Sequence, residues 1–252
     1  NMTTSPSPAD SAQPDVPNAA RIYSYTLGGT HYFPVDQAAA EYMFSLVPST
    51  PKWVRMLRGF LQQAARQLWA EGFTHFVDFA SGLPTEDHIH HVLPDAKIVY
   101  SDSDPATYAQ AQAMVGHLPN VRYLQHDVRD ARSLLESAQV RDFLDGERKV
   151  AIGLSGITVF LTPDEISQIF HDLYAWAAPG AKLYVTYETK LPNLMTPRLE
   201  QFLDMFRQAG SPFHLYSLDE SLAMSQPWRP APSGLQPLRE FLALPADYIT
   251  EA

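Results

Sequence analysis

Short apolar runs alternate with amphipathic stretches through the central part of the chain. The runs are rich in β-branched and aromatic residues and predict buried strands: HFVDF, KIVYSD, VRYLQHD, KVAIGLSG and AKLYVTYE. The stretches between them predict helices: PTEDHIHHVL, PATYAQAQAMVG, ARSLLESAQVRDFL and TPDEISQIFHDLYAWAAPG. Strands that alternate with helices in this way favour a parallel sheet with helices on both faces. Right-handed crossovers then predict an α/β protein with a doubly wound, Rossmann-like parallel sheet.

The regions that flank this alternation divide the chain into three parts. Residues 1–18 are rich in Pro, Ser, Asp and Ala, and they predict a disordered tail. Residues 19–72 join an aromatic segment to two helical patterns, and they predict an N-terminal helical segment that serves as a lid. Residues 73–252 then form the Rossmann-like domain with a C-terminal elaboration, in which PFHLYS predicts one more strand.

Capping residues mark several of the expected helix ends. Thr162 and Glu165 are spaced as a capping box, with Pro163 at the first helical position. Asp104 is expected to cap the helix that begins at Pro105, and Thr85 the helix in PTEDHIHHVL.

Composition narrows the possible partners. The 252 residues carry a net charge of -10, which disfavours a phosphate-binding face and hence nucleic acid as a partner. The chain has no cysteine, which excludes disulfides and thiolate metal sites and fits a reducing cytoplasm. It has neither an apolar run near the ~20 residues of a membrane span nor a signal-peptide pattern at its start. We therefore expect a cytoplasmic protein that does not bind membranes.

Three acids stand at the ends of three successive predicted strands. Asp78 follows the first, Asp102 the second and Asp127 the third. Ligands of open α/β sheets bind at the carboxyl ends of strands, and an acid about twenty residues after the first strand can accept the hydroxyls of a ribose. Asp127 could meet an adenine edge. A nucleoside that is cationic and lacks phosphates suits three acids, and S-adenosylmethionine has these properties.

The turn after the first strand agrees with this ligand. The dinucleotide fingerprint needs three glycines, but here only Gly82 is present, with Ala80 and Thr85 at the other two positions. A nucleotide-dependent oxidoreductase on the same fold is therefore a less favoured alternative.

Three segments resemble a known family. RIYSYTLGGTHYFPVDQ, FVDFASGLPTEDHIHHV and IVYSDSDP are similar to motifs of the uncharacterised class I S-adenosylmethionine-dependent methyltransferases that are abundant in actinobacteria and were long catalogued as a domain of unknown function. The similarity covers roughly residues 19–185. The sequence departs from the family pattern at Ser24, Tyr32, Gln37, Ala80 and Val159.

The resemblance implies a bacterial methyltransferase of the class I fold that converts S-adenosylmethionine to S-adenosylhomocysteine. Its acceptor is expected to be a small molecule, and the oligomeric state stays open. A non-catalytic module that kept the cofactor pocket is the alternative. The expected cofactor-binding residues are Tyr23, Tyr25, Gly28, Gly29, Asp78, Ala80, Ser81, Gly82, Pro84, Thr85, Asp102, Ser103, Asp127, Val128 and Ser155.

The tyrosines at 23 and 25 admit two interpretations. They pack in the core, or they lie over the cofactor, where aromatic faces attract a sulfonium. Methyl transfer needs alignment and exclusion of water rather than an acid/base pair. If a base assists, His31, Tyr187 and Glu188 are the candidates. The near-adjacent His88, His90 and His91 cannot all face one ion, so we expect no metal site.

Overall fold

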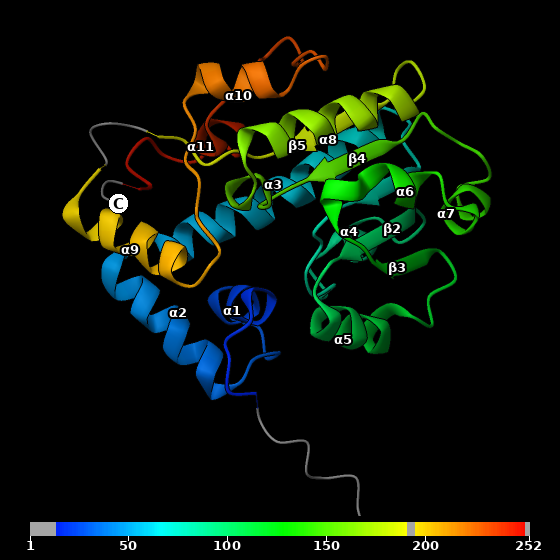
Figure 1. The fold of residues 1–252 in the computed structure, drawn as a ribbon. Helices are drawn as coiled ribbons and strands as arrows, with labels where there is room; N and C mark the ends of the chain where they lie inside the picture. The colour runs from blue at the N-terminus through cyan, green and yellow to red at the C-terminus, as the bar shows by residue number, and fades with distance from the viewer. Residues whose placement is uncertain (1–13, 191–194, 250–252) are drawn as a thin grey trace, which may run out of the picture.

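The computed structural model describes residues 14–190 and 195–249 and contains a parallel sheet with the strand order β3-β2-β1-β4-β5 (Figure 1). The strands are β1 (His75–Asp78), β2 (Lys97–Asp102), β3 (Val121–Gln125), β4 (Ala151–Leu154) and β5 (Lys182–Val185). Each lies in one of the apolar runs of the sequence, which confirms the α/β, Rossmann-like fold. The order reverses between β1 and β4, and ligand crevices form at such a point, outside the carboxyl ends of the strands.

Two apolar cores cover the two faces of the sheet. On one face, Val77, Val99 and Ile152 pack against helices α6 (Ala131–Leu135), α7 (Ala138–Phe143) and α8 (Pro163–Trp176). On the other face, Phe76, Ile98 and other strand residues pack against α3 (Thr50–Ala70), α4 (Ile89–Val92) and α5 (Pro105–Val115). The alternation of side chains along each strand decides which residue enters which core.

The N-terminal helices lie beside the sheet. They are α1 (Ala19–Thr26) and α2 (Pro34–Leu46), and α1 packs on both α2 and α3. Figure 1 shows α1, in dark blue, between α2 and the sheet. Part of the expected tail, residues 1–13, lies outside the described residues.

The C-terminal helices pack on three different partners. Helix α9 (Pro197–Gln208) contacts α2, α10 (Leu218–Met224) contacts α8, and α11 (Leu238–Phe241) contacts α3. The strand predicted in PFHLYS was wrong, because that segment makes only a single parallel bridge, between Thr189 and Tyr216. No described helix is long and apolar enough to cross a bilayer.

Helix boundaries show which capping signals were decisive. The capping box of Thr162 and Glu165 and the cap by Asp104 are both present, as predicted. ARSLLESAQVRDFL forms two helices rather than one, because Ser137 caps a new helix by accepting a hydrogen bond from the Val140 amide. Thr85 caps no helix, since α4 begins at Ile89 and His88 caps it. Short 3-10 turns follow β3 and β4, at Val128–Asp130 and Thr158–Phe160.

Candidate functional site

Hydrogen bonds to β1 and β2 hold the turn that follows β1. Ala80 and Gly82 have positive φ angles, 52° and 64°. Inside the turn, the Ser81 amide donates to the Ser101 carbonyl at 2.8 Å, and the Ser81 hydroxyl donates to the Asp78 carbonyl at 2.9 Å. Left-handed backbone strains a residue with a side chain, so Ala80 keeps in the turn a conformation that suits glycine better.

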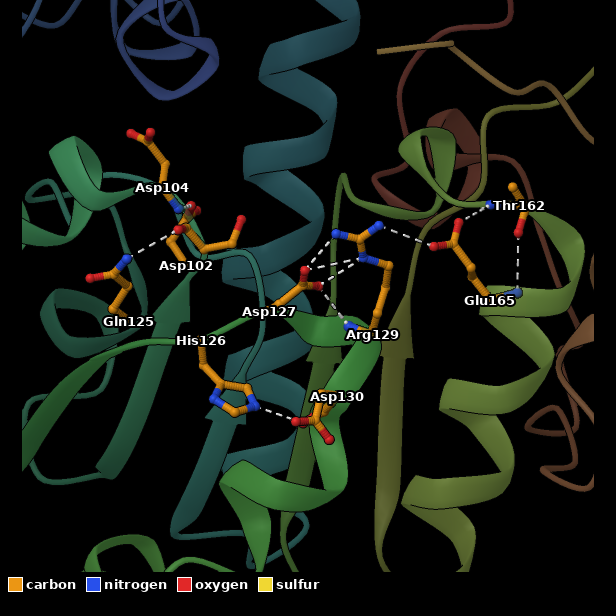
Figure 2. A network of polar contacts seen from close by, with 10 residues as sticks. Asp102, Asp104, Gln125, His126, Asp127, Arg129, Asp130, Thr162 and Glu165 are labelled. Atoms are coloured by element: carbon orange, nitrogen blue, oxygen red, sulfur yellow. Dashed lines mark hydrogen bonds and ion pairs between the residues drawn. The ribbon is translucent and has the colours of Figure 1, made fainter. Parts of the chain in front are cut away.

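Asp102 fastens the same turn from the end of β2. Its Oδ2 accepts the Gly82 amide at 3.1 Å and its Oδ1 accepts the Asp104 amide at 3.0 Å. Burial raises the pKa of the Asp102 carboxyl, while the hydrogen bonds from these amides lower it. A carboxylate has about four acceptor positions, so Asp102 can hold the turn and still accept the two hydroxyls of a ribose. Figure 2 shows Asp102 and Asp104 together at this corner.

Asp78 lies deeper than Asp102, at the centre of the sheet. It is 3% exposed, and the Tyr184 hydroxyl donates to its Oδ1 at 2.7 Å. Burial raises the pKa of Asp78 to about 6, partly offset by the Ser81 and Tyr184 hydroxyls. Tyr184 reaches Asp78 by crossing Gly153 of β4, where a Cβ would lie 2.1 Å from the tyrosine ring.

Helix α1 closes over this corner. A Cβ placed on Gly82 would meet the Ala20 Cβ at 3.9 Å, and the Asn18 amide side chain donates to Asp104 Oδ2 at 2.7 Å. The start of α1 is anchored in turn by Arg21, which forms a buried ion pair with Asp36 of α2 at 2.7 Å. The hydrogen bond from Asn18 to Asp104 therefore ties the N-terminal segment to the turn that follows β2.

The tyrosines of α1 point in different directions. The Tyr25 hydroxyl donates to Glu41 at 2.7 Å, and its ring lies on Phe44 and Tyr32, so it belongs to the α1–α2 contact. The Tyr23 ring instead lies 5.3 Å from the Arg58 guanidinium carbon of α3.

The glycine pair Gly28-Gly29 ends helix α1. Gly28 has a φ angle of 81°, and a Cβ on Gly29 would lie 2.7 Å from Ser24 Oγ. The role visible for the pair is thus a close turn at the C-terminus of the helix.

The acid after β3 already has a cationic partner. Both oxygens of Asp127 accept from Arg129, with the shortest contact at 2.6 Å, and Arg129 also reaches Glu165 at 3.4 Å (Figure 2). Arg129 holds the pKa of Asp127 below its usual range. An adenine amino group would have to share this carboxylate with Arg129.

The remaining expected cofactor residues differ in exposure. Pro84 and Val128 are buried, Thr85 is half-buried with its hydroxyl donating to Asp87, and Ser103 is exposed. Ser155 follows β4 and is half-buried.

A few buried side-chain atoms have no hydrogen-bond partner in the described part of the chain. Among the residues that the structure describes, the buried side-chain atoms of this kind are Ser24 Oγ, Arg58 Nε and Nη1, and Glu188 Oε2. Arg58 approaches Asp87 at 3.5 Å, an ion-pair distance without hydrogen-bond geometry. Arg58, Asp87 and Glu188 all act on the pKa of Tyr23, which burial raises. We call Tyr23, Arg58, Asp87 and Glu188 the Tyr23 cluster.

Sequence reasoning missed Arg58 of this cluster. It lies within a long amphipathic helix, where an arginine ordinarily faces water, yet it is only 8% exposed. The available signal was its position next to Leu57 on the apolar side of α3, whose side chain approaches Gly156 after β4.

The three candidate bases occupy different surroundings. His31 is half-buried between α1 and α2. Tyr187 packs on the α8 side of the sheet, with its hydroxyl 2.7 Å from Ser225 Oγ. Glu188 is 7% exposed, and burial raises its pKa to about 7.

The histidines around α4 stabilise the turn. His88 is 2% exposed, its Nδ1 accepts the Ile89 amide, and its Nε2 donates to the Ser81 carbonyl at 3.1 Å. Burial lowers its pKa well below the ordinary value, as this neutral tautomer requires. His90 contacts the Tyr100 hydroxyl at 2.9 Å. In residues 14–190 and 195–249, no three His, Asp or Glu side chains gather where they could bind a metal ion.

These residues fit S-adenosylmethionine better than a dinucleotide. Asp102 offers acceptor positions for a ribose, and Arg58 offers unpaired donors for the one carboxylate of the cofactor. Several of the ionisable groups gathered at the strand ends are acids, which would repel a pyrophosphate. The corner built by Gly82 and Asp102 therefore suits a nucleoside with no phosphate.

Comparisons with known proteins agree with this geometry. A profile of the S-adenosyl methyltransferase family matches residues 5–227. The fold is similar to that of a candidate methyltransferase from Thermobifida fusca YX, with 27% identity and a TM-score of 0.80 over 89% of this chain and 85% of that chain. A DUF574 family protein from Streptomyces avermitilis MA-4680 matches at 25% identity and a TM-score of 0.81, over 92% of this chain and 91% of that chain.

More distant matches concern the fold alone. The S-adenosylmethionine-dependent methyltransferase SibL is 15% identical with a TM-score of 0.50, over 85% of this chain and 59% of that chain. No curated protein matches the chain in sequence. The profile match spans most of the chain and confirms the resemblance drawn from the sequence motifs. The chain belongs to the S-adenosyl methyltransferase family and is an enzyme with S-adenosylmethionine as its cofactor.

Proposed function

We propose that this methyltransferase acts on a small-molecule acceptor, which binds between α1, α3 and the segment that follows β5. The observation that carries the proposal is the Tyr23 cluster. Arg58 and Glu188 are each less than a tenth exposed, and both carry side-chain atoms without a hydrogen-bond partner among the described residues. Buried polar groups are nearly always hydrogen-bonded, so these two indicate where ligands complete the structure. An acceptor that reaches them has to pass beneath the surface of the protein.

Each part of the cofactor has a candidate partner. Asp102 would hold the ribose, and Arg58 the carboxylate of the amino acid, with Tyr23 beside it. Asp127 would contact the adenine edge, in competition with Arg129. When bound, S-adenosylmethionine supplies an activated methyl carbon attached to a cationic sulfur.

The protein contributes to the reaction by positioning the reactants and by excluding water from the site. Methyl transfer depends mainly on alignment of the acceptor atom with the methyl carbon and on exclusion of water. Helix α1, held by Asn18 and Arg21, covers the corner where the cofactor would lie. The acidic net charge of the chain, -10, argues against a nucleic acid as the acceptor. We also propose a cytoplasmic location.

The test has a binding step and a transfer step. Calorimetry with S-adenosylhomocysteine should show micromolar or tighter binding, and the same measurement with NAD should show none. Incubation with S-adenosylmethionine labelled in its methyl group, together with pools of small amines, phenols and carboxylic acids, should move the label into the small-molecule fraction. Label found only in precipitated protein or nucleic acid would contradict a small-molecule acceptor.

A further inference from the structure

Glu188 is the least compensated charged residue near the site. Its Oε2 has no hydrogen-bond partner among the described residues, and the residue is 7% exposed. No ion pair in the described part of the chain includes it. An ionised carboxylate buried without a partner is strongly destabilising, and burial accordingly raises the pKa of Glu188 to about 7. A protein keeps such a group where a ligand supplies the missing partner.

The alternation of side chains after β5 places Glu188 on the α3 face of the sheet, where we propose that the cofactor binds. Extended residues alternate between the two faces of a sheet. Tyr184 reaches Asp78 on the α3 face, while Tyr187 packs with the core on the α8 face. Between them, the Thr186 hydroxyl accepts the Gly156 amide at 2.8 Å, which joins the ends of β4 and β5. Glu188 follows on the α3 face, close enough to Tyr23 of α1 for its charge to raise the pKa of that tyrosine.

Arg58 and Glu188 act on Tyr23 but do not pair with each other. Arg58 approaches Asp87, in the segment between β1 and α4, at 3.5 Å, whereas Glu188 follows the edge strand β5. Relative to Tyr23, the cation therefore lies toward β1 and the carboxyl toward β5. The Gly82 corner lies on the first side, so Glu188 is placed beyond the cofactor, where an acceptor would approach.

We propose that Glu188 binds the acceptor as a cation and accepts its proton, and that the acceptor is a primary or secondary amine. This inference rests on the proposed function. A bound sulfonium repels a second cation, and a carboxylate at the transfer point offsets that repulsion. An amine enters as its ammonium form, pairs with Glu188 and gives it one proton. The nitrogen lone pair then forms the bond to the methyl carbon, and the electron pair of the breaking carbon–sulfur bond stays on sulfur. The product leaves as an N-methylammonium ion, and Glu188 returns its proton to water.

The acidity of Glu188 favours amines over alcohols. A primary amine has a pKa of about 10.4, as in lysine, and water, a guide to simple alcohols, has one of about 15.7. A base with a pKa near 7 can remove a proton from an alkylammonium ion at a useful rate. The pKa of a simple alcohol is too far above that of the base for the same transfer to be useful.

Two cofactor analogues test the position of Glu188 without a known acceptor. S-adenosylhomocysteine lacks the methyl group, and sinefungin carries a C–NH3+ group in place of the S–CH3+ group. The ammonium of sinefungin therefore occupies the place of the transferred methyl. We expect sinefungin to bind the wild-type protein more tightly than S-adenosylhomocysteine does. We expect Glu188→Gln to weaken sinefungin at least tenfold and S-adenosylhomocysteine less than twofold.

The outcomes separate this inference from the proposed function. Equal loss of both ligands in Glu188→Gln would assign Glu188 to the amino-acid end of the cofactor and overturn the inference, as would no change in either. Failure of S-adenosylhomocysteine to bind the wild-type protein would instead refute the proposed function. Glu188→Asp serves as a second variant, in which a partial return of the sinefungin preference is expected. Asp87→Asn, an acid of the same cluster that is partly exposed and already near Arg58, should leave the ratio of the two affinities unchanged.

Discussion

Polar groups at the ends of β1 and β2 differ from those of the Tyr23 cluster in whether the protein itself supplies their hydrogen-bond partners. At the strand ends the acids already have protein partners: Asp78 has Tyr184, and Asp102 has the amides of Gly82 and Asp104. In the Tyr23 cluster, atoms of Arg58 and Glu188 have none among the residues that the structure describes. Asp78 is as deeply buried as Arg58 and Glu188, so burial alone does not explain the difference.

The strand ends therefore form a part of the site that is ordered before a ligand binds, which we call the prebuilt region. The Tyr23 cluster forms a part whose hydrogen bonds a ligand would complete. Hydrogen bonds that hold Asp102 in place keep its oxygens ordered before any ribose arrives, which lowers the entropy cost of binding. Unpaired groups in the Tyr23 cluster lower the stability of the free protein, and a ligand that pairs them restores it. The strand ends would recognise the nucleoside of the cofactor. The Tyr23 cluster would bind the charged end of the cofactor and the acceptor.

The largest effect is expected at Arg58. Arg58→Met keeps most of the side-chain volume but removes the cation that we assign to the cofactor carboxylate. Loss of one partner of a buried charge pair costs about 2–5 kcal/mol, so S-adenosylhomocysteine should bind at least ~30-fold more weakly. A derivative of S-adenosylhomocysteine without the carboxylate should bind the wild-type protein and the variant with similar affinity. Arg55→Met, at an exposed position of the same helix, is the matched control; equal weakening of both ligands in Arg58→Met would contradict the assignment.

Glu188 should make the free protein less stable as the pH rises. Its pKa in the folded protein is about 7, above the ordinary glutamate value of 4.5. The folded state therefore holds the proton more tightly than the unfolded state, and stability falls between pH 4.5 and pH 7, by up to about 3 kcal/mol. Glu188→Gln removes this dependence, so the variant should gain stability relative to wild type as the pH rises. Urea unfolding at pH 5 and pH 8 measures the difference, and a constant difference would show that Glu188 is not a strained acid.

Asp102→Ala should weaken the prebuilt region. Hydrogen bonds to a charged acceptor contribute about 1.5–3 kcal/mol each, so the affinity for S-adenosylhomocysteine should fall at least tenfold while the protein stays folded. Asp127→Ala should cost less, because Arg129 already occupies that carboxylate. Calorimetry on both variants gives the comparison. Unchanged affinity in Asp102→Ala would remove Asp102 from the site.

The two tyrosines of α1 should differ in effect: Tyr23 should influence ligand binding and Tyr25 the stability of the protein. Tyr23→Ala should weaken S-adenosylhomocysteine by roughly 1–2 kcal/mol if the ring faces the ligand. Tyr25→Ala should mainly lower the melting temperature, because its ring and hydroxyl contact α2. Melting temperature and affinity measured on the same samples decide the matter. Normal affinity in folded Tyr23→Ala would end the lid interpretation for that residue.

The smallest effect is expected at Ala80. Its φ of 52° is strained for a residue with a Cβ, at about 1–2 kcal/mol, while glycine costs about 0.5–1 kcal/mol more in unfolded-state entropy. Ala80→Gly should therefore stabilise the protein by at most about 1.5 kcal/mol and leave ligand affinity unchanged. Destabilisation in urea unfolding would show that the turn is relaxed with alanine.

The sequence by itself determined the sheet and the corner with Asp78, Gly82 and Asp102. Apolar runs of strand length and turn residues are local features, and the carboxyl ends of neighbouring parallel strands always meet at one edge. The capping box at Thr162 was visible for the same reason, because all its partners lie within three residues. Where two local signals competed, as at Ser137 and His88, the sequence did not show which cap would form.

Only the tertiary structure decided the Tyr23 cluster. Its members come from α1, α3, the turn before α4 and the segment after β5, so their meeting depends on how the helices cross the sheet. Arg58 looks like an ordinary surface arginine of a long helix, but it is buried in the fold, with Tyr23 of α1 beside it. Likewise, Tyr23 and Tyr25 looked equivalent in one aromatic motif, but the helix turns them to different neighbours. The sequence thus predicted the corner where we propose that a nucleoside lies, and the packing of distant elements decided which charges are left for the ligands to pair.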